Sequence, residues 1–196
     1  MTKSSRVISM SSANSKNVIL GIGNKALSDD AAGIKVARHI IKNHPKLTAF
    51  HIIDGGLLNY EMTSVLENAQ NLIIIEAATL GHAPGTISTL IGTDMDNMLK
   101  RVQRNATETA LADMFEMARL ARHLPPNRAL VTVEPKKTSW GNRLSASVAK
   151  AIPQLAENAL TMMSHWTGLP FREPESKPQT SHTETRSPTS NRSVDK

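Results

Sequence analysis

The sequence predicts a single α/β domain, a three-layer sandwich in which helices cover both faces of a mostly parallel sheet. Short runs of consecutive aliphatic residues alternate along the chain with longer segments whose apolar residues repeat at helical spacing. Brief stretches rich in glycine and proline separate the two kinds of segment. Uninterrupted aliphatic runs are typical of strands covered on both faces, and strand–helix alternation is typical of a parallel sheet. We expect this domain to occupy residues 18–168.

Each strand is predicted from an apolar run that ends at a turn signal or a charge. The five predicted strands are Val18–Ile22, Thr48–Ile53, Leu72–Ile75, Thr86–Ile91 and Ala129–Val133. Glycines follow the first and second strands, and Glu134-Pro135 follows the last. We therefore expect Asp54-Gly55-Gly56 to be a turn at the end of the second strand.

Four helices are predicted from apolar spacing and from residues that begin or end helices. Ser28 is expected to cap the first helix, which continues to Asn43 before Pro45. The other predicted helices are Tyr60–Asn68, Thr107–Leu124, which Pro125-Pro126 ends, and Leu144–Trp166; the polar segment 94–104 predicts no definite element. The predicted inner stripes are Ile34, Ala37 and Ile41; Leu111, Met114, Phe115 and Ala118; and Ile152, Leu155, Ala159 and Met162.

The composition excludes several classes of protein. The chain has no cysteine, which excludes disulfides, thiolate metal sites and cysteine nucleophiles. Residues 1–17 and 169–196 are polar and are expected to be disordered. They also hold four of the six net positive charges, and aromatic residues are only 3%, so nucleic acid is not an expected partner. Without an apolar run of about 20 residues or a secretory leader, we expect a cytoplasmic chain with no membrane insertion.

Carboxylates follow three of the predicted strands. Asp29 and Asp30 lie after the first strand, Asp54 ends the second and Glu76 ends the third. The carboxyl ends of parallel strands share one edge of the sheet, so we expect these acids to meet there. Several carboxylates in one crevice repel one another unless a cation lies among them or their pKa values rise. The sequence therefore indicates a cation site.

Simpler interpretations of the same residues remain open. Asp29 and Asp30 also suit the first turn of a helix, and Asp54 also suits an Asx turn. Glu76 favours a site, because an acid directly after four aliphatic residues cannot simply lie on a solvated face. A dinucleotide loop is an alternative, since Gly21, Gly23 and Ala26 fit a loose G-x-G-x-x-G/A pattern with Asp54 as the ribose-binding acid. The two acids at the start of the helix argue against this dinucleotide loop, because a pyrophosphate needs the positive helix end to be free of carboxylates.

Six short motifs, in this order, resemble those of the [NiFe]-hydrogenase maturation proteases over roughly residues 18–165. They are Gly21-x-Gly23-Asn24-x-x-x-Ser28-Asp29-Asp30-x-x-Gly33, Asp54-Gly55-Gly56, Leu72-Ile73-Ile74-Ile75-Glu76-Ala77, Pro84-Gly85-Thr86, Leu111-Ala112-Asp113 and Glu134-Pro135. The resemblance implies a twisted five-stranded sheet. It also implies an endopeptidase that removes the C-terminal extension of the hydrogenase large-subunit precursor, with nickel in that precursor as the recognition signal and no permanently bound cofactor.

The resemblance also implies roles for particular residues. Asp30 and Glu76 correspond to metal ligands, and Asp54 corresponds to an acid implicated in catalysis. Glu76 departs from the family's aspartate by one methylene. The third ligand, a histidine in the family, corresponds to Thr107, and a neutral hydroxyl is a poor nickel ligand.

Nearby residues offer weak substitutes for that third ligand. Glu108 and His82 are the candidates, while a capping box of Asn105 and Glu108 is the simpler interpretation of this segment. The remaining histidines in the globular part lack a supporting context: His39, His44, His51, His123 and His165. Two functions therefore stay open, a metal-dependent peptidase without a serine or cysteine nucleophile, and a non-proteolytic relative that acts as a hydrogenase assembly chaperone.

Overall fold

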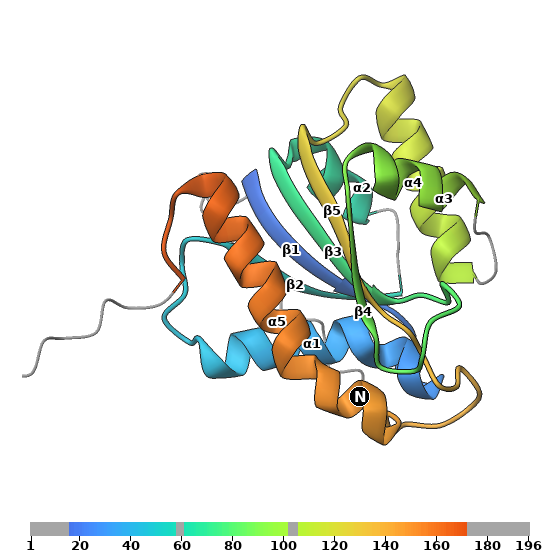
Figure 1. Ribbon diagram of the computed structural model, residues 1–196. Helices are drawn as coiled ribbons and strands as arrows, with labels where there is room; N and C mark the ends of the chain where they lie inside the picture. The colour runs from blue at the N-terminus through green and yellow to red at the C-terminus, as the bar shows by residue number, and fades with distance from the viewer. Residues whose placement is uncertain (1–15, 58–60, 102–105, 172–196) are drawn as a thin grey trace, which may run out of the picture.

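Five strands form one sheet in the order β2-β1-β3-β5-β4 (Figure 1). The computed structural model describes residues 16–57, 61–101 and 106–171, with only the backbone for residues 61 and 106–108. The strands are β1 (Asn17–Ile22), β2 (His51–Gly56), β3 (Asn71–Ala77), β4 (Ile87–Ile91) and β5 (Asn127–Val133). β4 is antiparallel to β5 and the other neighbours are parallel, which confirms the predicted sheet.

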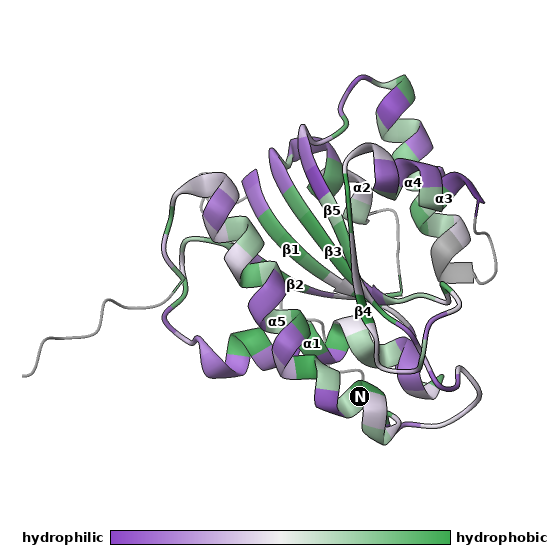
Figure 2. Cartoon of the chain, in the orientation of Figure 1, coloured by the Kyte–Doolittle hydropathy of each residue, from purple (hydrophilic) through white to green (hydrophobic). Residues whose placement is uncertain are grey.

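Helices cover both faces of this sheet (Figure 1). They are the 3-10 turn η2 (Ser28–Ala31), α1 (Ala32–Asn43), α2 (Glu61–Asn68), α3 (Thr93–Arg101), α4 (Ala106–Leu120) and α5 (Ala146–Thr167). α1 and α5 pack on one face, and α2, α3 and α4 pack on the other. Hydrophobic residues fill the central strands in Figure 2, as burial on both faces requires.

The predicted helix stripes are correct for most positions. The four named residues of α4 are all buried, as are the first three of α5. Ile41 of α1 is instead 43% exposed, and Ile40 is buried in its place. Met162 of α5 is only partly buried, while Met163 is fully buried. In both helices the buried residue is the immediate neighbour of the predicted one, a difference that is within the width of an apolar helix face.

Two strands continue past their predicted ends. Asp54-Gly55-Gly56 belongs to β2 rather than to a turn, because a bulge between Gly21 and Ile22 lets Gly56 pair with Ile22. Glu76 likewise lies inside β3, where it pairs with Thr132 of β5. Asp54 and Glu76 therefore both lie within strands that are hydrogen-bonded to a neighbouring strand. This placement fixes the direction of both side chains more firmly than a turn would.

The predicted helix termini are partly wrong. Ser28 does not cap α1, because η2 precedes it and the Ser28 hydroxyl donates instead to the Ser139 carbonyl at 2.9 Å. α4 ends before Pro125-Pro126, where Arg122 adopts a left-handed φ of 61° and the His123 amide bonds back to the Ala118 carbonyl.

Most of the predicted disordered segments, 1–17 and 169–196, lies outside the described residues. Two described residues of these segments are ordered: Asn17 begins β1, and Phe171 packs against the core with its ring 6.1 Å from that of His44. No helix in the described part of the chain is both long and apolar enough to cross a membrane.

The start of α1 is held against the sheet by two glycines that touch. A Cβ added at Gly21 of β1 would lie 2.1 Å from the Gly33 carbonyl oxygen. A Cβ added at Gly33 would lie 1.9 Å from the Ile75 carbonyl oxygen and 2.4 Å from that of Ile22. Only hydrogen atoms fit at these positions. The glycine pair therefore sets the distance between η2, α1 and the residue that precedes Glu76.

Replacement of Gly33 by alanine tests this contact. We expect Gly33→Ala to lower the free energy of unfolding by about 3 kcal/mol, because backbone atoms must move to admit the methyl group. Alanine favours helices by about 1 kcal/mol over glycine, so the two effects have opposite signs. Gly168→Ala is the control: its φ is 69° but no atom lies within 4 Å. We expect it to cost about 1 kcal/mol. Urea unfolding that shows Gly33→Ala as stable as wild type would contradict the contact.

Candidate functional site

Asp30 is a buried acid in η2, at the carboxyl edge of the sheet. Its side chain is 6% exposed, and one carboxylate oxygen accepts a hydrogen bond from the Asn24 amide at 2.8 Å. Gly23 makes this approach possible, since a Cβ there would lie 1.8 Å from the Asp30 carbonyl oxygen. Burial raises the pKa of Asp30, and the Asn24 hydrogen bond offsets only part of that effect. A partly desolvated carboxylate with one hydrogen bond retains oxygen lone pairs for a cation.

Glu76 lies on the neighbouring strand β3, and η2 packs against this strand. Its side chain is 2% exposed. Alternation along β3 places it on the same face as Ile74, toward α2, α3 and α4. The paired residue Thr132 is 1% exposed on that face, and its hydroxyl lacks a hydrogen-bond partner among the described residues. Sequence reasoning missed Thr132, because a threonine inside a strand gives no functional signal.

Asp54 does not join these two acids as predicted. It pairs in register with Gly21, which faces α1, so its side chain lies on the face of the sheet opposite to Glu76. One oxygen lies 2.8 Å from Arg38 Nε of α1 and 3.4 Å from Lys25 Nζ of the loop before η2. The other is buried with no hydrogen-bond partner among the described residues. Two cations therefore already balance the charge of Asp54.

Asp29 has a structural role that the sequence did not reveal. It is fully buried, and its carboxylate accepts the backbone amides of Ser145 at 2.6 Å, Lys136 at 2.9 Å and Lys137 at 3.1 Å. Burial alone would raise the pKa of Asp29, but these hydrogen bonds outweigh burial and lower it. Asp29 thereby ties the loop 134–145 to η2. That loop carries Trp140, which is 83% exposed.

The acid of the Glu134-Pro135 motif anchors a second loop. Its carboxylate accepts the amides of Leu80 at 2.8 Å and Gly81 at 3.4 Å. Its backbone amide donates to the Thr86 carbonyl, and its carbonyl accepts the Gly85 amide. Glu134 therefore fixes both ends of the loop that follows Glu76. The Pro84-Gly85-Thr86 motif belongs to this arrangement.

The expected third ligand falls where the structure describes no side chain. Thr107 lies in the first turn of α4, but its side chain and those of Asn105 and Glu108 lie outside the described residues. His82 is exposed in the loop after β3. Among the side chains that the structure describes, no group of three or more His, Cys, Asp or Glu residues is placed to hold a metal ion.

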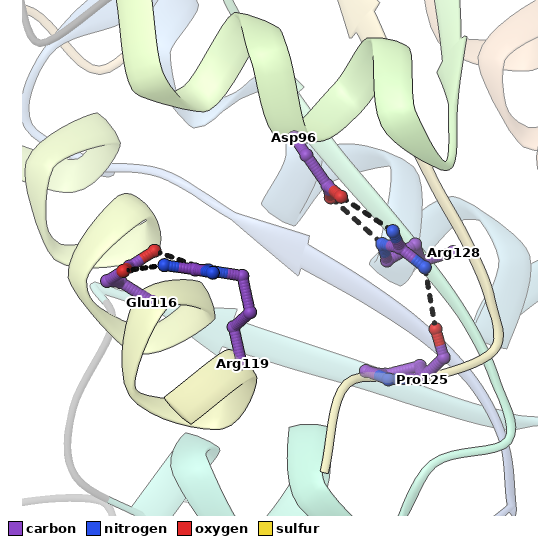
Figure 3. Close-up of polar contacts among 5 residues, drawn as sticks. All are labelled: Asp96, Glu116, Arg119, Pro125 and Arg128. Carbon is purple, nitrogen blue, oxygen red and sulfur yellow. Dashed lines mark hydrogen bonds and ion pairs between the residues drawn. The ribbon is translucent and has the colours of Figure 1, made fainter. Parts of the chain in front are cut away.

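A separate cavity of about 210 Å³ lies between α3 and α4. Its apolar lining includes Leu99, Phe115 and Leu124. Asp96 beside it accepts two hydrogen bonds from Arg128, at 2.9 and 2.6 Å, and Glu116 pairs with Arg119 on α4 (Figure 3). The Asp96 carboxylate raises the pKa of Arg128. These charges are paired within the protein, so the cavity carries no assembled reactive group.

Comparison with known proteins identifies the family. Residues 34–162 match the family described as hydrogenase maturation protease, which is more than half of the chain. The chain belongs to the hydrogenase maturation protease family. It is 25% identical over 150 residues to the hydrogenase expression/formation protein HupD of Rhodobacter capsulatus, a match that covers 76% of this chain and 71% of HupD. It is 25% identical over 147 residues to the hydrogenase 2 maturation protease of Escherichia coli, with 74% and 89% covered.

Solved structures of the family share this fold. The hydrogenase maturating endopeptidase HybD of Escherichia coli matches with a TM-score of 0.73 and 24% identity, over 78% of this chain and 94% of HybD. The [NiFe] hydrogenase maturation protease HybD of Thermococcus kodakarensis matches with a TM-score of 0.64 and 20% identity, over 76% and 99%. The fold and family predicted from the sequence are confirmed. In this family member, η2 places two buried acids where a dinucleotide would need a free helix end, which disfavours that alternative.

The role of Asp29 predicts a pH-dependent loss of stability. Asp29→Asn replaces an acceptor oxygen with an amide that faces backbone donors, so we expect a loss of about 2 kcal/mol in unfolding free energy at pH 7. Because the folded pKa of Asp29 is lowered, its contribution is present above the ordinary value of 3.8 and disappears as pH falls through the folded pKa. The two proteins should therefore converge in stability below about pH 4.

Urea unfolding at a series of pH values measures this difference. Asp113→Asn, at an exposed position of α4, is the matched control and should stay within about 0.5 kcal/mol of wild type. A loss for Asp29→Asn that is independent of pH, or no loss at pH 7, would refute the role of the charged carboxylate.

Proposed function

We propose that this chain is an endopeptidase that recognises a nickel-loaded hydrogenase large-subunit precursor and removes its C-terminal extension. The observation that carries the proposal is the burial of Asp30 and Glu76 on two elements in contact, η2 and β3, within a member of the maturation protease family. Nickel belongs to the substrate in this proposal. The chain supplies ligands for it and does not carry it as a resident cofactor.

Asp30 and Glu76 are the proposed nickel ligands. Both are carboxylates in a water-poor position, where an incoming cation interacts strongly with each of them. Burial raises the pKa of Asp30 because the charged form loses hydration, and a cation bound beside it would compensate that loss. Bound between the protein and the precursor, nickel polarises the scissile carbonyl or activates a water molecule. The longer side chain of Glu76 requires a metal position about one methylene farther from β3 than aspartate would.

Asp54 acts in this proposal as a positioning residue. Its side chain lies on the opposite face of the sheet from Glu76, so direct ligation with Glu76 is not proposed. Its contact with Lys25 instead holds the segment between β1 and η2. That segment includes Asn24, whose amide bonds Asp30. Loss of Asp54 therefore affects the orientation of Asp30 through the loop.

The assembly-chaperone alternative is less favoured. The matching family and the similar Escherichia coli protein are both described as proteases. The proposed ligand set nevertheless departs from the resemblance at Thr107. Direct measurement of cleavage therefore separates the two functions, since a chaperone would bind the precursor and leave its length unchanged.

Substitution of Asp30 should separate activity from stability. We expect Asp30→Asn to reduce cleavage of nickel-loaded precursor about 100-fold, because a neutral amide is a weaker ligand. Its unfolding free energy at pH 7 should rise rather than fall, because the charged form of Asp30 is disfavoured by burial. Gel electrophoresis or mass spectrometry of the precursor measures cleavage, and urea unfolding measures stability.

Controls distinguish ligation from general damage. Glu76→Gln should lose cleavage to a similar extent, while Glu67→Gln, at an exposed position of α2, should retain it. Full cleavage by both Asp30→Asn and Glu76→Gln would exclude the proposed ligands. Stable binding of precursor by wild type without any shortening would favour the chaperone.

A histidine at position 107 tests the third ligand. We expect Thr107→His to raise cleavage severalfold, because imidazole binds nickel better than a hydroxyl does. Thr109→His, two residues farther along and therefore on a different side of α4, is the control and should not raise it. Equal activity of Thr107→His and wild type would mean that another group completes the site.

A further inference from the structure

One face of α1 carries four basic side chains and no acid. Lys35, Arg38, His39 and Lys42 are spaced i, i+3, i+4 and i+7, which places them in one stripe along the helix. The two lysines are exposed, and Arg38 is about half exposed. Residues 32–43 contain no Asp or Glu. The stripe therefore presents a concentrated positive charge that is unrelated to the polar ends of the chain.

This stripe forms one wall of a groove between α1 and α5. The groove has a volume of about 550 Å³, and its other wall consists of Leu144, Ala149, Ile152 and Pro153. Figure 1 shows α1 and α5 side by side on the same face of the sheet, and the two helices pack together. One wall is thus cationic and the other is apolar. No acidic residue lines the groove.

The positive charge of the stripe is mostly unbalanced within the protein. Arg38 pairs with Asp54, but Lys35 and Lys42 form no ion pair with any residue that the structure describes. The first turns of α5 add Lys150, and the first acid of that helix is Glu157. Ion pairs within the described part of the protein therefore do not balance the positive charge of Lys35 and Lys42. An anionic group on a binding partner would balance it.

We propose that this groove docks an acidic amphipathic helix of the hydrogenase large-subunit precursor; the identity of that partner rests on the proposed function. Positions 35 and 42 are about 10 Å apart along α1, which is the length of two helical turns. A docked helix with Asp or Glu at i, i+3, i+4 and i+7 presents its charges to α1 and its aliphatic side to α5. This is the helix-in-groove mode of recognition.

The composition of the groove favours a peptide over other anions. Basic residues line one side of the groove, and apolar residues line the other. Among its described residues the groove has no Phe, Tyr or Trp on which bases could stack, which disfavours a single-stranded nucleic acid. A peptide helix with one acidic and one apolar side matches both walls.

Docking at this groove adjoins the proposed site. Arg38 lines the groove and also contacts Asp54 at 2.8 Å, at the end of β2. A precursor held between α1 and α5 therefore lies next to the end of β2, where Asp54 contacts Lys25 of the segment before Asp30. The groove would contribute to the choice of substrate without taking part in the chemistry.

The test measures binding and cleavage separately, with the full chain and the nickel-loaded precursor encoded in the same genome. The variant Lys35→Gln with Lys42→Gln removes two charges from the stripe and leaves Arg38 in place. We expect its Kd for precursor to rise about tenfold at low salt, and the difference to disappear at 0.5 M salt (~4 Å screening length). A control pair, Lys100→Gln with Arg101→Gln on α3, removes the same charge from the other side of the sheet and should leave Kd unchanged.

A second variant tests the apolar wall. Ala149→Asp, at an exposed position of α5, places an acid in the groove and should weaken binding at least as much as the double lysine variant. Cleavage at saturating precursor should stay at the wild-type rate for both variants. Thermal unfolding of each variant verifies the fold.

The outcomes distinguish the two proposals. Unchanged Kd in both groove variants, with normal cleavage, overturns docking at this groove and leaves the peptidase intact. Weakened binding in both variants, with no cleavage by wild type, supports the groove and overturns the peptidase. Loss of binding to anionic lipid vesicles or to RNA, with precursor binding unaffected, overturns the precursor as the occupant.

Discussion

The contact between Gly21 and Gly33 is the constraint on which the rest of the structure depends. It lets the backbone of α1 lie directly against β1 and β3, close to the peptide bond that precedes Glu76. Any side chain at these positions would separate the helix from the sheet. With the helix this close, η2 is held over the carboxyl edge of the strands. The position of Asp30 relative to β3 is therefore set by these backbone contacts, together with the hydrogen bonds of Asp29 to the loop 134–145.

Two adjacent acids of η2 have opposite physical roles because their partners differ. Asp29 is surrounded by backbone amides that stabilise its charge, and it connects η2 to the loop 134–145, which is distant in sequence. Asp30 receives a single amide and is left with a burial cost that the protein itself does not compensate. A charge that the fold supports is structural, whereas a charge that the fold leaves unsupported is available to a ligand. The same comparison explains Asp54, whose charge is balanced by Arg38 and Lys25.

Most of the fold could be predicted from the sequence, and part of the site could not. Long aliphatic runs predict strands reliably, so the number of strands and their positions along the chain agree with the structure. The bulge that keeps Asp54 inside β2 depends on pairing with β1, which a local pattern does not contain. That extension also decides which face Asp54 occupies, so Asp54 lies on the face opposite to Glu76 and the expected meeting of these two acids was wrong. The structural role of Asp29 could not be predicted for a similar reason, since its hydrogen-bond partners lie more than 100 positions later in the chain.

The loop 134–145 has a property that follows from how Asp29 and Ser28 hold it. Ser28 and Asp29 hold the loop through hydrogen bonds to main-chain atoms of Lys136, Lys137, Ser139, Gly141 and Ser145, including one from the Ser28 amide to the Gly141 carbonyl at 2.8 Å. Gly141 is constrained, because a Cβ there would meet the Ser28 hydroxyl at 2.6 Å. The exposed side chains, including Trp140, are not needed for the shape of the loop. Substitution of these exposed side chains should therefore leave the backbone conformation of the loop unchanged. Different side chains can be introduced at these surface positions without a loss of the fold.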